Sequence, residues 1–146
     1  MANAARAIII ENGRLLVMFR NKHGSQYYTL VGGRLDGNET PEQAVGREVM
    51  EETGLKVTTA RQVFFEDHPE PYNKQFIFLC EVAPHGDVAI QEYSEEGMMN
   101  RLEANVHKPL WIDLKGLMQI PFRTPQLQQA IATAAKKGFP KEPIKL

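Results

Sequence analysis

The chain has 146 residues, of which 42% are apolar and 24% charged, and its formal net charge is −1. These are ordinary values for a globular domain with a sizeable core, so we expect a single domain over residues 1–146. A near-neutral chain without a basic stripe argues against a broad surface for long RNA or DNA.

Membrane and secretory segments are not expected. No apolar run approaches the roughly 20 residues of a membrane span, and the N-terminus lacks the apolar core of a signal peptide. The single cysteine, Cys80, lies in an apolar strand pattern and cannot form an internal disulfide. We therefore expect a cytoplasmic protein without a membrane partner, in which Cys80 packs in the core.

The first part of the chain predicts three strands. An apolar run over 4–10 is followed by the hairpin-turn pair Asn12-Gly13 and by a second strand over 15–19. A third strand over 27–31 leads directly into paired glycines, which tolerate backbone conformations closed to other residues.

A helix is predicted to begin after Thr40 and to end near Thr53. Thr40 is a favourable N-cap residue, Pro41 suits the first helical position, and Gln43 completes a capping box. Gly54 tolerates the positive φ that commonly closes a helix.

The remainder of the chain predicts mainly strands. The expected elements are strands over 56–65, 75–82 and 110–114 and a terminal helix over 125–136, with 84–109 mostly loop. Strands on both sides of a helix indicate an α/β or α+β fold.

Three glutamates of the predicted helix, Glu48, Glu51 and Glu52, stand at i, i+3 and i+4. At about 100° per residue they share an arc of roughly 100° on one face, where like charges repel. A divalent cation such as Mg²⁺ would reverse that repulsion, because hard ions bind carboxylate oxygens. The spacing alone is also typical of a solvated helix face, so both interpretations stand at this point.

The glutamates belong to a longer pattern with fixed offsets. Its members are Gly33, Glu39, Arg47, Glu48, Glu51, Glu52 and Gly54, with apolar residues at Val49 and Leu55. Over these 23 residues the chain resembles the Nudix box in every defined position. One departure precedes the box: Val31 stands where many Nudix proteins have proline before the paired glycines.

The resemblance implies a Nudix fold, which is a mixed β-sheet sandwiched between α-helices. It also implies a hydrolase that uses Mg²⁺, or Mn²⁺ in its place, to cleave the pyrophosphate linkage of a nucleoside diphosphate joined to another group. By resemblance, Glu48, Glu51, Glu52 and the Gly33 carbonyl hold the metal. Glu52 and Glu48 are candidate general bases, and Arg47 orients a catalytic glutamate. From spacing alone, Arg47 also suits an i, i+4 ion pair with Glu51.

Some Nudix proteins recruit their general base from a later loop. The glutamates available for that role here are Glu92, Glu95, Glu96 and Glu103, each of which also suits an exposed loop. The alternative function is a non-catalytic nucleotide-binding or regulatory module. Such a module would be expected to have lost box glutamates, and this chain has them all.

The sequence does not decide which nucleotide derivative is the substrate. Pro71, sixteen residues past Leu55, resembles the ADP-ribose pyrophosphatase subgroup, whereas Tyr72, one residue later, resembles the diadenosine polyphosphate subgroup. Tyr72, Arg20 and Arg34 are candidate substrate-binding residues, although a surface role suits the two arginines equally. The expected partner is a small nucleotide derivative, with nucleoside triphosphates included, and homodimers are frequent in the family.

Overall fold

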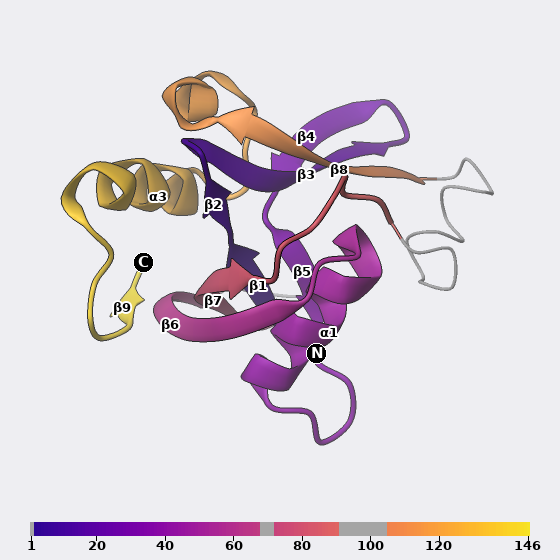
Figure 1. The fold of residues 1–146 in the computed structure, drawn as a ribbon, viewed down its shortest axis with the longest axis vertical. Coiled ribbons are helices and arrows are strands. Elements are labelled where there is room, and N and C mark those ends of the chain that lie inside the picture. Colours follow the sequence, from indigo (N-terminus) through magenta and orange to yellow (C-terminus); the bar gives the residue numbers. More distant parts are fainter. Residues whose placement is uncertain (1, 68–71, 91–104) are drawn as a thin grey trace.

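The computed structural model describes residues 2–67, 72–90 and 105–146. These residues form two β-sheets, two α-helices and one 3₁₀-helix (Figure 1). None of the helices in the described part of the chain has the length and apolar character needed to cross a membrane.

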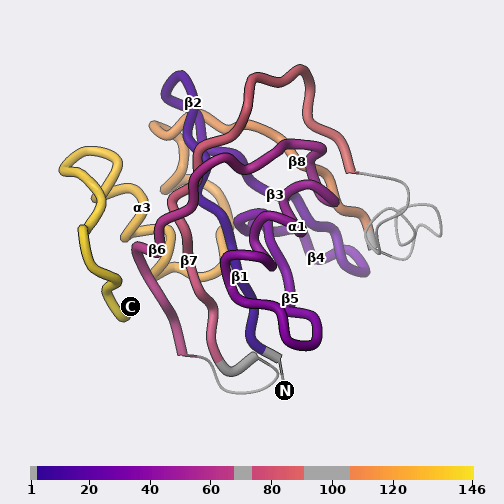
Figure 2. Tube along the Cα trace, turned by 60° about the horizontal axis from the view of Figure 1, so that its bottom comes forward, coloured from indigo at the N-terminus to yellow at the C-terminus, as the bar shows by residue number. Residues whose placement is uncertain are grey.

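The first sheet has five strands in the order β5-β1-β7-β6-β9. Their bounds are Ala2–Ile8 (β1), Val31–Arg34 (β5), Val57–Asp67 (β6), Tyr72–Val82 (β7) and Ile144–Lys145 (β9). β1 is parallel to β7 and antiparallel to β5, and Figure 2 shows it between these two strands. The sheet is therefore mixed, as predicted.

The second sheet is centred on β3, Arg14–Lys22, which is antiparallel to all its neighbours. Those neighbours are β2 (Ile10–Glu11), β4 (Ser25–Thr29) and β8 (Asn105–Asp113). Asn12 and Gly13 link β2 to β3 with φ of 53° and 74°, both in the left-handed region. This is the predicted two-residue hairpin turn.

Helix α1, Pro41–Thr53, has the predicted ends. The Thr40 hydroxyl accepts the Gln43 N–H at 3.2 Å, and the Gln43 side chain accepts the Thr40 N–H at 2.9 Å. Gly54 closes the helix with a φ of 78°. The Thr124 hydroxyl caps α3 (Pro125–Lys137) by accepting the Leu127 N–H, and the 3₁₀-helix η1 (Leu114–Gln119) precedes it.

Two apolar clusters hold the layers together. On one side, Val45 and Val49 of α1 pack with Leu16 of β3 and Phe78 of β7, and on the other, Ile131 of α3 packs in a separate cluster. The two helices therefore cover different sides of the sheets, which confirms the predicted sandwich. Cys80 lies in the α1 cluster, where burial raises the pKa of its thiol to about 12.

The boundaries of several strands differ from prediction. The strand expected over 27–31 is two strands, because the chain crosses from the second sheet to the first at Leu30. The late strand begins at Asn105, so the loop expected over 84–109 was too long. Residues 105–108 pair with β3 through their backbones. Because most of these residues are polar, their sequence does not show an apolar strand pattern.

Candidate active site

The face of α1 that bears Glu48 and Glu52 packs against β5. The Glu52 side chain is fully buried, and its Oε1 accepts the backbone N–H of Gly32 at 2.5 Å. Gly32 has a φ of 142°, and a Cβ there would clash with the backbone of Ala5 in β1. The site therefore requires glycine at this position, as the sequence suggested.

The second glycine of the pair makes room for Glu48, which is only 7% exposed. A Cβ on Gly33 would lie 2.7 Å from the carboxylate carbon of Glu48, well inside contact distance. The Glu48 carboxylate therefore rests directly on the β5 backbone. The helix and the glycine strand together bring two carboxylates into a sheltered position.

Arg47 ties α1 to the loop that precedes it. Its guanidinium donates to both carboxylate oxygens of Glu39, at 2.8 and 3.0 Å, and to the carbonyl oxygen of Arg34 at 3.0 Å. The Glu39 hydrogen bond raises the pKa of Arg47, and the same bond lowers the pKa of Glu39. Both groups are therefore held in their charged forms.

The same guanidinium reaches the glutamates of the helix. Arg47 Nη1 donates to Glu48 Oε1 at 3.0 Å and to Glu51 Oε2 at 3.2 Å. The geometry thus contains both interactions considered for Arg47, the i, i+4 pair and the contact with a buried glutamate. This positive charge offsets part of the repulsion among neighbouring carboxylates, which burial would otherwise intensify.

The donor set of this site suits a hard cation. Carboxylate oxygens beside a glycine backbone are the ligands that Mg²⁺ prefers, and the absence of a side chain at Gly33 keeps the Glu48 carboxylate against that backbone. Within the described residues, no three Asp, Glu, His or Cys side chains already converge as a metal site. Glu48 and Glu51 turn toward Arg47, and Glu52 turns toward Gly32.

The candidate substrate-binding residues are spread over three strands. Arg20, on β3, donates to Thr29 Oγ1 at 3.2 Å and contacts His107 Nε2 at 3.1 Å. Arg34 is exposed at the end of β5 opposite Ala4, while Tyr72 begins β7 opposite Ala2. The backbones of Arg34 and Tyr72 therefore flank the start of β1, whereas Arg20 belongs to the other sheet.

Some candidates lie outside the described residues. These are Pro71 and the later glutamates Glu92, Glu95, Glu96 and Glu103, and the side chain of Tyr72 is also not described. Conversely, sequence reasoning did not single out Thr29 and His107 as partners of Arg20. Only the pairing of β3 with β4 and β8 brings these two residues to Arg20.

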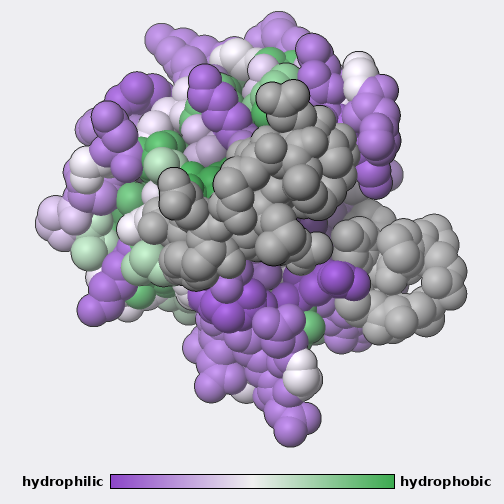
Figure 3. All heavy atoms as spheres, turned by 90° about the vertical axis from the view of Figure 1, so that its right-hand side faces the viewer, coloured by the Kyte–Doolittle hydropathy of each residue, from purple (hydrophilic) through white to green (hydrophobic). Residues whose placement is uncertain are grey.

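The surface around the helix is polar. Figure 1 places α1 and the loop before it at the bottom of the molecule, and this region is covered by hydrophilic atoms in Figure 3. A polar surface beside two buried carboxylates is compatible with a charged, water-soluble ligand.

Comparison with known sequences gives a consistent result. The family model described as NUDIX domain matches residues 1–131. The NAD-capped RNA hydrolase NudC of Chromobacterium violaceum is 28% identical over 118 residues, which are 80% of this chain and 40% of that protein. NudC of Shigella flexneri is 38% identical over 76 residues, 52% of this chain and 29% of that protein. The chain thus spans less than half the length of these curated relatives.

Solved structures share the fold. A MutT NUDIX hydrolase from Burkholderia pseudomallei superposes with a TM-score of 0.66 at 22% identity, covering 87% of this chain and 94% of that one. An ADP-ribose pyrophosphatase from Streptococcus suis gives a TM-score of 0.64 at 19% identity, covering 99% of this chain and 98% of that one.

Proposed function

Because the chain belongs to the NUDIX family, we propose that it is a Mg²⁺-dependent hydrolase of nucleotide derivatives. It cleaves the pyrophosphate linkage of a nucleoside diphosphate joined to a second group. The observation that supports this most strongly is the burial of Glu48 and Glu52 against Gly32 and Gly33. Burying two carboxylates is costly, so a purely structural helix face would not favour it.

Within this proposal, Glu48, Glu51 and Glu52, with the Gly33 carbonyl, would hold Mg²⁺. A cation held there would supply charge neutralisation at the phosphate oxygens and a lower pKa for the attacking water. Arg47 positions Glu48 through the hydrogen bond at 3.0 Å. Glu52 or Glu48 accepts the proton of the water that attacks phosphorus.

The substrate is proposed to be a small nucleotide derivative. ADP-ribose and NAD-capped RNA, the compounds in the names of similar proteins, both contain an adenosine diphosphate unit. ADP-ribose is therefore the first compound to test. Arg20 and Arg34 are the proposed phosphate-binding side chains, since each bears a guanidinium suited to phosphate oxygens.

The test is a panel assay with Mg²⁺, in which nucleoside monophosphate release is measured from ADP-ribose, dinucleoside polyphosphates, nucleoside triphosphates and nucleotide sugars. We expect turnover of at least one compound, and its loss on chelation of Mg²⁺. Absence of turnover with every compound, under Mg²⁺ and Mn²⁺ alike, would reject the proposed activity.

The contacts of Arg47 with Glu48 and Glu51 favour one alternative, a nucleotide-binding module without turnover. In such a module the arginine permanently neutralises the helix glutamates. Equilibrium binding of ADP-ribose distinguishes the two functions, because the module binds the compound and leaves it intact.

A further inference from the structure

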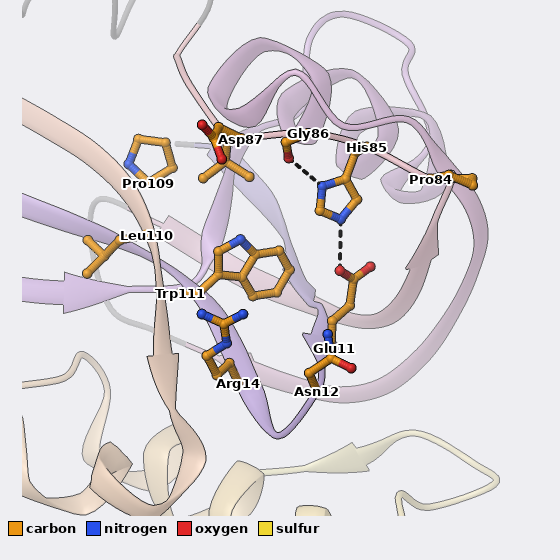
Figure 4. Close-up of a pocket in the computed structure, with 11 residues that line it drawn as sticks. Glu11, Asn12, Arg14, Pro84, His85, Gly86, Asp87, Pro109, Leu110 and Trp111 are labelled. Carbon is orange, nitrogen blue, oxygen red and sulfur yellow. Dashed lines mark hydrogen bonds and ion pairs between the residues drawn. The ribbon is translucent and has the colours of Figure 1, made fainter.

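Apart from the candidate active site, the structure has a pocket between the Asn12 turn, the segment 84–88 and β8 (Figure 4). Its volume is about 820 Å³, within the range of roughly 300–1,000 Å³ that is typical of small-molecule sites. None of the residues proposed above for catalysis lines it. The lining runs along β8 from Trp111, which pairs with Leu16 of β3, to Pro109, which pairs with Met18, so it ends two residues short of Arg20 in the register of β3.

Hydrogen bonds connect the segment beside the pocket, residues 84–89, to the end of α1 and to β2. The N–H of Ala89 donates to the carbonyl oxygen of Thr53 at the end of α1, at 3.1 Å. His85 faces the Gly86 carbonyl oxygen through Nδ1 at 2.7 Å and Glu11 through Nε2 at 2.8 Å. Both partners are acceptors, so only the imidazolium donates to both. These bonds raise the pKa of His85, and Glu11 balances its charge.

The His85 ring leaves part of Trp111 uncovered. The two rings are nearly parallel, at 12°, with centroids 5.9 Å apart. Carbon atoms in contact are about 3.5–4.0 Å apart, so at this centroid distance the imidazole does not cover the whole indole face. A second flat ring can therefore lie on the indole beside His85, which serves as a wall of the pocket.

Two further charges face the pocket, from Arg14 and Asp87. Both residues are exposed, and among the described residues neither side chain has a hydrogen-bond or ion-pair partner. In Figure 4 they lie on opposite sides of the indole. The pocket thus offers a flat aromatic wall, an acceptor on one side and a guanidinium on the other.

We propose that this pocket is a second nucleotide site, which binds an aminopurine nucleotide. The purine ring stacks on Trp111, the exocyclic amine donates to Asp87, and the phosphate accepts from Arg14. Such a group has two sources: it is either the far half of the hydrolysable substrate or a separate nucleotide effector. The site itself does not depend on the proposed hydrolysis.

Trp111 is the only tryptophan of the chain, so its fluorescence reports directly on the pocket. The experiment titrates the protein, without metal, with AMP, GMP and IMP, exciting at the red edge where purines do not absorb. We expect a saturable change with AMP or GMP and weaker binding of IMP, which lacks the exocyclic amine. Asp87→Asn should reduce the preference of the pocket for AMP or GMP over IMP.

The Arg14→Gln variant tests the phosphate contact. It should weaken binding of the nucleotide about tenfold, the effect of losing a charge-assisted hydrogen bond, and leave binding of the matching nucleoside unchanged. Lys136→Gln, on the exposed surface of α3, removes the same charge at a remote position and should bind as wild type does. No saturable change at millimolar AMP or GMP would overturn the proposal, as would equal nucleotide affinity in the two variants.

The values of KM and kcat for the Arg14→Gln variant show whether the purine in the pocket belongs to the substrate or to a separate effector. A raised KM at unchanged kcat supports a pocket that holds half of the substrate, whereas unchanged kinetics with weaker AMP or GMP binding support an effector site. If the enzyme proves inactive, the fluorescence titration still decides whether the pocket binds nucleotides.

Discussion

Glu52 is the residue on which the proposed chemistry depends most. Its buried carboxylate accepts the Gly32 N–H, and the amide oxygen of glutamine would accept the same bond. Glu52→Gln should therefore remove the charge, retain the shape, and lower kcat by about 100-fold or more. Initial rates with Mg²⁺ and thermal unfolding check this together. A well-folded variant with more than a tenth of the wild-type rate would exclude Glu52 from catalysis.

His85 should have a raised pKa in the folded protein, because its imidazole faces first the Gly86 carbonyl oxygen and then the Glu11 carboxylate. A raised pKa means that this contact stabilises the folded state fully below the ordinary value of 6.5 and fades as pH rises through the higher folded value. NMR titration of the imidazole protons measures it, and Glu11→Gln should bring the pKa down. A wild-type pKa at or below 6.5 would show that the contact is absent in solution.

For single residues, the sequence predicted contacts only between positions that are close together in the chain. Arg47 and Glu51 stand at i and i+4 of one helix, so their spacing alone predicted the pair, whereas contact of Arg47 with a catalytic glutamate was expected only from the family resemblance. The partners of Arg20, Thr29 and His107, are 9 and 87 residues away in the sequence. Their contact depends on strand register, which residue spacing does not reveal.

Among the elements, α1 contains a glycine that the structure does not require. A Cβ at Gly46 would meet nothing within 4 Å, and the residue lies in the interior of the helix. Gly46→Ala should therefore stabilise the protein by up to about 1 kcal/mol, through helix propensity alone. Urea unfolding measures the change, and Gly32→Ala, which would clash with β1, is the destabilising comparison. A destabilised Gly46→Ala would mean that α1 has a closer neighbour at this position.

The link between α1 and the preceding loop depends on the shape of the Arg47 side chain. One planar guanidinium contacts Glu39, Glu48 and Glu51, which the compact ammonium of lysine cannot do at once. Arg47→Lys should lower both the rate and the free energy of unfolding, the latter by about 1–2 kcal/mol, the scale of one lost hydrogen bond to a charged group. Paired kinetic and urea measurements test this. An unchanged rate in a destabilised variant would leave Arg47 a structural role only.

The elements themselves were predictable where capping and turn residues mark them. Thr40, Gln43 and Gly54 marked the ends of α1, and Asn12-Gly13 marked the first hairpin. The division of 27–34 between two sheets was not predictable, because β4 and β5 take partners that lie elsewhere in the chain.

For the whole molecule, the mixed sheet was expected only from the family resemblance. β1 and β7 pair in parallel although their paired residues, such as Ile8 and Leu79, are 70 or 71 positions apart, and local hydropathy cannot predict such a pairing. β1 pairs with β5 through its other edge, so β5 is held in the sheet where its glycines meet α1. The site is thus a product of the topology as much as of the Nudix box.

Binding of Mn²⁺, followed by the electron paramagnetic resonance signal of the free ion, tests the central claim most directly. The wild-type protein should bind Mn²⁺ saturably, and Glu48→Gln and Glu52→Gln should each weaken binding at least about tenfold, since each removes a carboxylate charge. Glu42→Gln, exposed in the first turn of the same helix, should bind as wild type does. Equal binding by all four proteins, or none by the wild type, would contradict the assignment of these glutamates to a metal site.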